Sequence, residues 1–248
     1  MTVAHPLDNA VWRSLTTGHG ELAEVHGRAR RYPPDVSPFA AVDGFDDEAW
    51  DDLATLAGPG GRVVLFRDRI PSPPAGWREL LRGPGHQLVL GAGGLQRVAP
   101  VDTVRLTERD VPEILALVRA TEPGPFLDRT VTMGRYHGHV HGGRLVAMAG
   151  ERLHPAGFTE ISAVCTAAHA RGRGLASALT QHVADAILAR GEVPLLHVAS
   201  TNAGAQRVYE RLGFEQRRVV DFVALAAPPD PARADGREPS TQRNHAPA

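Results

Sequence analysis

The spacing of apolar residues changes along the chain and is most regular between residues 101 and 225. Apolar positions after Thr107 recur on a helical period, and Thr107 with Asp110 forms a capping-box pattern that would begin this helix. Further helices are predicted at 175–190 and 202–212, and strands at 103–106, 135–140, 145–153, 158–166, 195–199 and 214–225. This order predicts an α/β fold, with helices packed against a mixed sheet.

The first hundred residues show weaker periodicity and contain many prolines. An acidic run that begins at Asp46 predicts a helix over 46–56, because negative charge is favourable at a helix N-terminus. Apolar runs at 62–67 and 86–90 predict strands, and the glycine-rich stretch 91–100 is typical of a linker. We therefore expect an accessory N-terminal domain over 1–99, a second domain over 100–227 and a disordered tail over 228–248.

Composition argues against several classes of function. The chain has 248 residues with 27 basic and 28 acidic side chains, so it has no basic excess that would attract nucleic acid. No stretch approaches the roughly 20 consecutive apolar residues of a membrane span, and residues 1–15 lack the pattern of a secretion signal. The single cysteine, Cys165, excludes an internal disulfide and a multi-cysteine metal site. We expect a cytoplasmic protein that binds neither nucleic acid nor a membrane.

Candidate chemistry lies where the predicted strand 158–166 leads into the helix that begins at residue 175. Glycines at a helix start let a ligand approach the backbone, whose free N–H groups and dipole favour an anion. Arginine adds charge-assisted hydrogen bonds to phosphate oxygens. The pattern predicts a pyrophosphate-binding loop, with an exposed arginine turn as the alternative. The loop residues are Arg171, Gly172, Arg173, Gly174, Leu175 and Ala176.

Two common nucleotide-binding motifs do not fit this loop. A P-loop requires a lysine, and all 27 basic residues are arginine. The dinucleotide fingerprint requires a third glycine where Ser177 stands, and it opens an N-terminal βαβ unit. The loop therefore points to a different phosphate-bearing ligand.

Arg171, Gly174 and Ala176 match the Arg-x-x-Gly-x-Ala signature of the GNAT superfamily, the GCN5-related N-acetyltransferases. A second block, from Asn202 to Phe214, resembles the asparagine and Tyr-x-x-x-Gly-Phe pattern of the same superfamily. One predicted helix and one predicted strand separate the two blocks, as that fold requires. The resemblance covers about residues 101–225. It implies an N-acetyltransferase that moves an acetyl group from acetyl-CoA to a primary amine, by direct attack through a tetrahedral intermediate.

The resemblance also implies roles for individual residues. In such enzymes the strand before the loop splays from its neighbour and binds the pantetheine arm, and one of its amides polarises the thioester carbonyl. Here that strand end is Val164, Cys165 and Thr166. Asn202 would contact the pantetheine or the substrate, and Tyr209 would act as the general acid for the CoA thiolate.

The general base is less clearly marked. Histone-type members of the superfamily carry a catalytic glutamate where this strand has Glu160, and a carboxylate in a partly apolar cleft has a raised pKa that suits a proton acceptor. The alternative is a strand glutamate paired with an arginine, with water as the base. His197, on the strand beside the cleft, is a second candidate acceptor, and a buried, hydrogen-bonded histidine explains it as well.

Two further possibilities have simpler explanations. His137, His139 and His141 share one face of a strand and could bind zinc, although a solvent-facing edge strand explains them too, and we expect no metal. Cys165 would need a paired base to act as a nucleophile, and no such arrangement is evident in the sequence.

No motif specifies the acceptor, which we expect to be a small-molecule amine or a peptide N-terminus. One alternative is a non-catalytic acyl-CoA-binding regulatory module, against which Tyr209 argues, and another is an acyltransferase that uses a different acyl-CoA. Residues 1–99 resemble in layout a degenerate GNAT-like domain that walls the substrate cleft, and a separate binding domain is the alternative.

Overall fold

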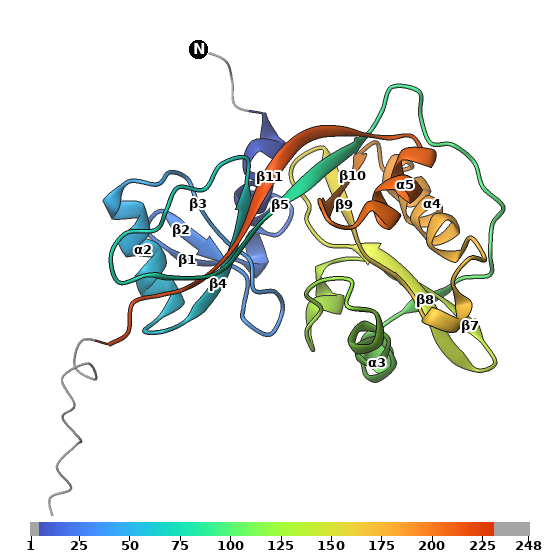
Figure 1. The fold of residues 1–248 in the computed structure, drawn as a ribbon, viewed down its shortest axis with the longest axis horizontal. Coiled ribbons are helices and arrows are strands. Elements are labelled where there is room, and N and C mark those ends of the chain that lie inside the picture. The colour runs from blue at the N-terminus through green and yellow to red at the C-terminus, as the bar shows by residue number, and fades with distance from the viewer. Residues whose placement is uncertain (1–4, 231–248) are drawn as a thin grey trace, which may run out of the picture.

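The structure is a computed structural model that describes residues 5–230. Most of the expected disordered tail, residues 231–248, lies outside the described residues. The chain forms two lobes that lie side by side (Figure 1). We call residues 5–82 the N-terminal lobe and residues 83–218 the C-terminal lobe, which carries the predicted loop. Residues 219–226 return to the N-terminal lobe.

A mixed sheet of eight strands joins the lobes in the order β4–β11–β5–β10–β9–β8–β7–β6. All neighbours are antiparallel except β9 and β10, which are parallel. The strands are β4 (Arg62–Arg67), β5 (Arg78–Leu90), β6 (Val104–Leu106), β7 (Tyr136–His141), β8 (Arg144–Glu151), β9 (Phe158–Thr166), β10 (Val193–Ala199) and β11 (Phe214–Ala226).

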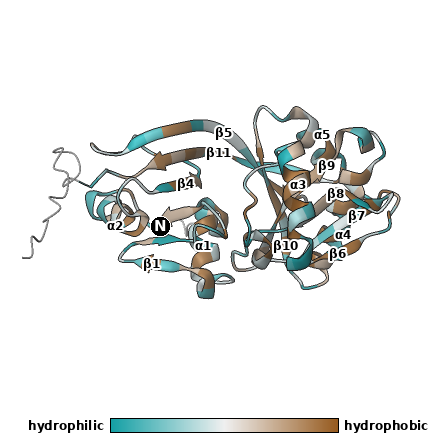
Figure 2. Cartoon of the chain, turned by 90° about the horizontal axis from the view of Figure 1, so that it is seen from below, coloured by the Kyte–Doolittle hydropathy of each residue, from teal (hydrophilic) through white to brown (hydrophobic). Residues whose placement is uncertain are grey.

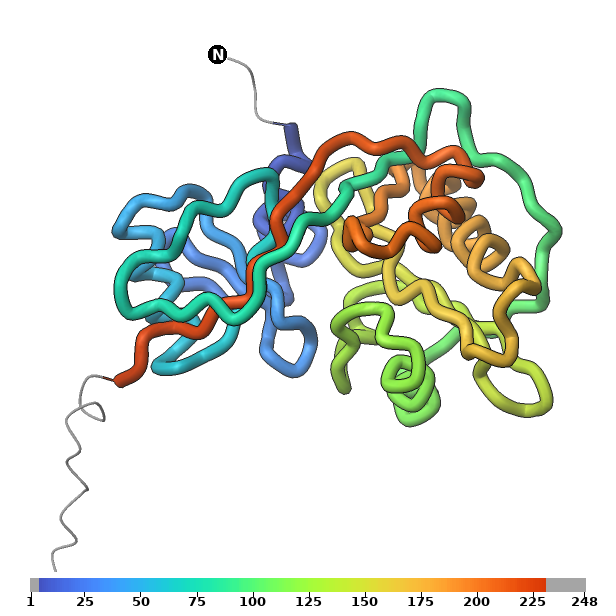
Figure 3. The backbone as a smooth tube through the Cα atoms, in the orientation of Figure 1, coloured from blue at the N-terminus to red at the C-terminus, as the bar shows by residue number. Residues whose placement is uncertain are grey.

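Strands β5 and β11 run side by side through both lobes (Figure 3). In the N-terminal lobe β11 also pairs with β4, and in the C-terminal lobe β5 also pairs with β10. The expected linker over 91–100 is present as a connection without a helix or strand. The sheet nevertheless continues across this boundary, so the division into 1–99 and 100–227 does not separate two independent sheets.

The N-terminal lobe adds a three-stranded antiparallel sheet and two helices. The sheet contains β1 (Glu24–His26), β2 (Ala29–Arg31) and β3 (Ala40–Val42), and the helices are α1 (Ala10–Thr16) and α2 (Asp47–Ala57). Helix α2 begins at the predicted acidic run, where the Asp46 carboxylate accepts a hydrogen bond from the Ala49 N–H at 3.1 Å. The sequence pattern did not predict α1. It also did not predict the three short strands, because three residues are too few to show an alternation.

The C-terminal lobe packs helices against both faces of the sheet. Helix α3 (Val111–Thr121) lies on one face, and α4 (Leu175–Leu188) and α5 (Ala203–Arg211) lie on the other. Met148 of β8 packs in the core under α3, whereas its neighbours Ala147 and Ala149 pack in the core under α4. Hydrophilic and hydrophobic residues alternate along the helices (Figure 2), as expected for helices buried on one side.

Most predicted elements of this lobe are confirmed, including the capping box of Thr107 and Asp110 before α3. One strand is longer than the pattern suggested. β5 begins at Arg78 and not at residue 86, and it passes through Pro84. Proline is tolerated there because pairing with β10 begins only at Gly85, and the Pro84 carbonyl still accepts a hydrogen bond from the Ser200 N–H at 3.1 Å.

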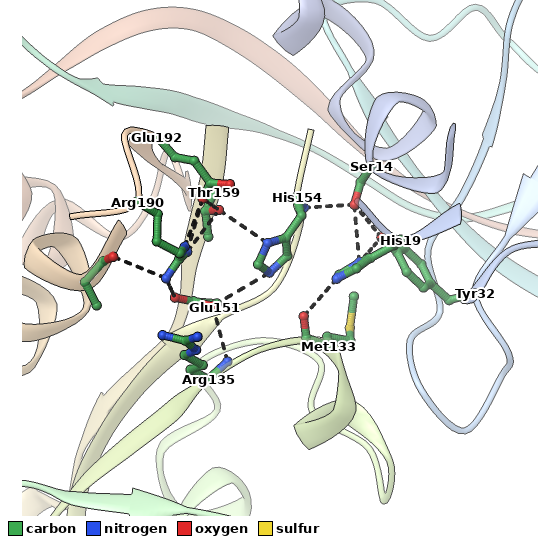
Figure 4. A network of polar contacts seen from close by, with 11 residues as sticks. Ser14, His19, Tyr32, Met133, Arg135, Glu151, His154, Thr159, Arg190 and Glu192 are labelled. Atoms are coloured by element: carbon green, nitrogen blue, oxygen red, sulfur yellow. Dashed lines mark hydrogen bonds and ion pairs between the residues drawn. The ribbon is translucent and has the colours of Figure 1, made fainter. Parts of the chain in front are cut away.

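A buried polar network joins the two lobes (Figure 4). His19 Nε2 donates to the Met133 carbonyl oxygen at 2.8 Å, and its Nδ1 lies 2.9 Å from the Tyr32 hydroxyl. Ser14 Oγ accepts a hydrogen bond from the His154 N–H at 2.9 Å. Burial, and then the neighbouring His154, lower the pKa of His19 to about 4, so the contact is made by a neutral ring.

Candidate active site

The site begins where two parallel strands separate. β9 and β10 are paired from Phe158–Val193 to Ile161–Leu196, and within the described sheet no later residues of these strands pair with each other. β9 nevertheless continues to Thr166. On the side of β10, its backbone beyond Ile161 therefore faces an opening and not a neighbouring strand, which is the splay that the sequence resemblance implied.

A β-bulge lies at this opening. Ala163 has φ 54°, a left-handed conformation that is unfavourable for a residue with a side chain. Register with β8 is interrupted between Ser162–Gly150 and Cys165–Met148, so Ala163 and Val164 together face a single residue of β8. An extra residue of this kind reorients the backbone around it. The peptide groups at Ala163 and Val164 are thereby turned out of the ladder with β8, which resumes at Cys165.

The predicted phosphate loop follows β9 after one short turn, η5 (Ala168–Ala170). Gly172 and Gly174 both have φ 76°, in the left-handed region that glycine adopts without strain. Within residues 5–230, the N–H groups of residues 172–177 have no acceptor in the protein. The N-terminus of α4 adds the positive end of its dipole at the same place. The loop therefore presents donors and positive potential to an anion.

A cavity of about 660 Å³ connects the loop, the end of β9 and helix α5. Of the residues predicted to bind the cofactor, all except Arg173 line this cavity, and so does Tyr209. Arg173 is exposed on the loop and is not among the lining residues. The predicted residues brought together are Val164, Cys165, Thr166, Arg171, Gly172, Gly174, Leu175, Ala176 and Asn202.

The sequence reasoning missed one wall of this cavity, formed by the end of α3. Thr121, Glu122 and Pro123 line it there, and Val208 and Arg211 line it from α5. The sequence at the end of α3 carries the signal of a helix terminus, a proline just beyond the last helical residues. That signal says where a helix ends, but it does not say what the end faces.

Helix α5 brings the second sequence block to the cavity. Asn202 caps the helix, and its Oδ1 accepts a hydrogen bond from the Ala205 N–H at 3.0 Å. Tyr209, in the last turn of α5, is 6% exposed. Burial, and then the nearby Cys165 and Glu160, raise the pKa of Tyr209 well above its ordinary value. Its hydroxyl therefore carries a proton at neutral pH.

Glu160 lies outside this cavity and is fully buried. Arg152 donates two hydrogen bonds to its carboxylate, from Nε at 2.8 Å and from Nη2 at 2.6 Å, and His197 Nδ1 lies 2.8 Å away. Burial by itself raises the pKa of Glu160, but Arg152 and then His197 outweigh it and bring the pKa to about 2. This carboxylate is a weak proton acceptor. The geometry favours the ion-pair alternative over the general base that the sequence also allowed.

The tautomer of His197 follows from its neighbours. Gln87 Oε1 accepts a hydrogen bond from Arg217 at 2.7 Å, so Gln87 Nε2 is the donor to the Leu7 carbonyl at 2.9 Å and to His197 Nε2 at 3.0 Å. His197 Nδ1 then carries the proton and donates it to Glu160. Both ring nitrogens are engaged in the interior, which favours the buried, hydrogen-bonded interpretation of His197 over a catalytic one.

Cys165 is 7% exposed, and burial raises the pKa of its thiol to about 11 against the hydrogen bonds from the Thr121 side chain and the Met148 backbone. We therefore expect iodoacetamide to label the folded protein more than about tenfold more slowly than the urea-unfolded chain, because only the thiolate reacts. Mass spectrometry of timed samples measures both rates. Equal rates would show that the thiol is accessible and ionised.

The three alternating histidines do not converge on one point. His139 is bonded to the Asp102 carbonyl at 2.8 Å, and His137 contacts His182 of α4 at 3.1 Å. Over residues 5–230, no three side chains of His, Cys, Asp or Glu are grouped so that they could hold a metal ion. In the same part of the chain, none of the helices combines the length and apolarity that a bilayer crossing requires.

Comparison with known proteins places this geometry in a family. A family model described as FR47-like protein matches residues 136–223. A solved structure from Novosphingobium aromaticivorans, described as an acetyltransferase from the GNAT family, is 41% identical to this chain. That match covers 90% of this chain and 99% of the other, with a TM-score of 0.83. A GCN5-related N-acetyltransferase from Kribbella flavida, 20% identical over 91% of this chain and 98% of its own, shares the fold with a TM-score of 0.60.

A curated relative adds a shorter match. The mycothiol acetyltransferase of Mycolicibacterium vanbaalenii is 38% identical over 79 residues, which are 29% of this chain and about a quarter (26%) of that protein. The match to the Novosphingobium protein, by contrast, extends over both lobes at 41% identity. Together with the splayed strands and the glycine loop, it identifies the chain as a member of the GNAT family and as an acyltransferase.

Proposed function

We propose that this protein transfers an acetyl group from acetyl-CoA to a primary amine. The observation that carries the proposal is a single cavity, in which the splayed end of β9, the glycine loop and Tyr209 meet. The curated relative is matched over only a quarter of its length, so its acceptor is not carried over. A small-molecule amine or a peptide N-terminus remains the proposed class of acceptor.

The residues present fit the cofactor. The N–H groups of residues 172–177, which have no acceptor within the described chain, suit a pyrophosphate, and Arg171 on the cavity wall adds positive charge. The backbone of Val164 to Thr166 would hold the pantetheine arm, with Asn202 on the opposite side. Bound acetyl-CoA supplies an activated acyl group.

In the proposed reaction the amine attacks the thioester directly. The N–H of Val164 stabilises the oxygen that becomes negative in the tetrahedral intermediate, the kind of stabilisation that contributes most to acyl transfer. Tyr209, which holds its proton at neutral pH, protonates the departing thiolate. Glu160 is engaged with Arg152, so we assign removal of the amine proton to water.

The proposal is tested by mixing the protein with acetyl-CoA and a panel of primary amines, and following free thiol with a disulfide reagent. Amine-dependent thiol release supports it. Acetyl-CoA binding without release for any amine would favour the regulatory-module alternative. Parallel runs with propionyl-CoA and succinyl-CoA test the alternative acyl donors.

A matched pair of glycine substitutions tests the loop. Gly174 and Gly191 have φ 76° and 77°, and neither has a neighbour that a Cβ would meet within 4 Å. Valine at either position should destabilise the fold by about 1–2 kcal/mol, because both force a β-branched residue into the left-handed region. Only Gly174→Val should also weaken acetyl-CoA binding, by about tenfold or more, because Gly191 lies outside the cavity.

Calorimetric titration at a temperature where both variants are folded gives the two dissociation constants. Wild-type affinity in Gly174→Val would contradict the loop assignment. Equal weakening in Gly191→Val would show that the effect is one of stability and not of contact.

A further inference from the structure

One acidic side chain lines the cavity. Among the residues that the structure places around it, Glu122 is the only carboxylate, and Arg171 and Arg211 are the arginines. The arginines suit the phosphates of the proposed cofactor. A carboxylate does not bind phosphate, so the presence of Glu122 needs a different explanation.

The position of Glu122 is conformationally unfavourable. It ends helix α3 with φ 48° and ψ 53°, in the left-handed region, where glycine is the common residue. Apart from Ala163 in the bulge of β9, it is the only non-glycine residue with positive φ between residues 5 and 230. Unfavourable backbone conformations of this kind concentrate at functional sites. Both of these residues line or border the same site.

Glu122 lies close to the acyl-binding part of the cavity. Its neighbour Thr121 lines the cavity together with Cys165, which directly follows Val164 on β9. The Glu122 side chain is exposed, and in the described part of the chain it belongs to no ion pair. The C-terminal end of an α-helix is also the negative end of its dipole. Carboxylate and helix end together favour a cation there.

The segment after Glu122 is held by the N-terminal lobe. The Arg129 N–H donates to the Asp35 carbonyl at 3.0 Å, and their side chains form an ion pair at 3.2 Å. Thr130 Oγ1 donates to the Val36 carbonyl at 2.6 Å. These contacts fix the path of the chain that leads away from the cavity wall. At the start of this segment, the Glu122 N–H donates to the Val118 carbonyl oxygen at 2.8 Å, so the segment is held at both ends.

We infer that Glu122 is the specificity-determining residue for the acceptor, whose ammonium group binds to its carboxylate at the C-terminus of α3. The inference rests on the proposed function and names the acceptor more closely, as an amine that is positively charged when it binds. Neutral nucleophiles gain nothing from this contact.

The test compares Glu122→Gln with Glu113→Gln in the full-length protein. Glu113 lies on the same helix, is exposed and lies outside this cavity, so its substitution makes the same change in net charge. Acceptors are glycinamide, glucosamine and spermidine, which are wholly or largely cationic near neutral pH, and hydroxylamine, which is mostly neutral there. Glu122→Gln should raise the KM of the cationic acceptors about fivefold to tenfold, without changing acetyl-CoA affinity. The KM for hydroxylamine should not change in Glu122→Gln. The Glu113→Gln variant should behave as wild type with every acceptor.

The outcomes separate this inference from the proposed function. A wild-type protein that acetylates amines, with an unchanged KM in Glu122→Gln, overturns the role of Glu122 and leaves the function intact. An equal rise for cationic acceptors and hydroxylamine also overturns it, because the effect would then not be one of charge. Absence of turnover with every acceptor overturns the proposed function and this inference with it.

Discussion

Replacing Tyr209 by phenylalanine is expected to lower kcat about a hundredfold, the order of magnitude that a positioned general acid contributes. The phenol is 6% exposed, and burial keeps its pKa far above neutrality, so the wild-type group is always ready to donate. Phenylalanine preserves the ring and its edge-to-face contact with Phe214, whose ring centroid is 6.4 Å away. The acetyl-CoA dissociation constant should therefore stay near wild type, while kcat falls.

Steady-state kinetics give kcat and calorimetry gives the affinity. Tyr136→Phe is the matched control, because Tyr136 is also a buried tyrosine and it lies outside the cavity. Unchanged turnover in Tyr209→Phe would remove this residue from the mechanism. A similar loss in Tyr136→Phe would instead point to a general effect of removing a buried hydroxyl.

Replacing Arg152 by methionine is expected to reduce the free energy of unfolding by about 3–5 kcal/mol, the usual cost of leaving one member of a buried ion pair without its partner. The Glu160 side chain is fully buried, and it would lose both hydrogen bonds from the guanidinium. The guanidinium also lies 4.7 Å from the centre of the Phe39 ring, in the N-terminal lobe, so methionine fills an apolar site. Urea unfolding measures the loss.

Two control variants identify the cause of this loss of stability. The double variant Arg152→Met with Glu160→Met removes both charges and should recover much of the stability, since a buried pair can often be replaced by apolar residues. Arg97→Met breaks the exposed pair with Asp185 and should change stability by no more than about 1 kcal/mol. A loss in Arg152→Met no larger than that in Arg97→Met would contradict the buried-pair assignment.

The ion pair between Arg152 and Glu160 also makes the free energy of unfolding depend on pH. The pKa of Glu160 is lowered from an ordinary value of 4.5 to about 2. Its contribution to the free energy of unfolding is therefore complete above pH 4.5. As the pH falls toward 2 the folded carboxylate gains its proton and that contribution is lost. In Arg152→Met, burial is no longer opposed by the arginine, so this acid-side loss should shrink or reverse its sign.

The cofactor half of the site could be predicted from sequence because its information is local. An apolar strand, two glycines and a helix start lie within 31 consecutive residues, Phe158–Leu188, and each part has its own signature. The function of Glu160 could not be predicted this way. Its partner Arg152 precedes β9 on the chain, and His197 follows a whole helix later, so the ion pair exists only after folding.

The exposure of a side chain and the direction in which it points were equally hard to predict from the sequence. Arg173 has the same chemistry as Arg171, yet only Arg171 lines the cavity, a difference that depends on the folded path of the loop. The sequence around Glu122 predicts the end of a helix. Only the packing of α3 against β9 shows which surface that end faces. Strands β1, β2 and β3 of the N-terminal lobe are each three residues long and carry too little pattern to predict.

Strand β11 has a consequence for how the chain reaches its folded state during synthesis. Residues 214–226 supply a strand to both lobes, pairing with β4 in one and with β5 across both. A nascent chain that has emerged only as far as residue 213 therefore contains neither finished lobe, and its β4 and β5 edges stay unpaired along that side. Such sequence-distant pairing slows folding and leaves strand edges exposed meanwhile. Of the strands that the structure describes, β11 is the last to leave the ribosome, and its pairing completes the sheet of both lobes.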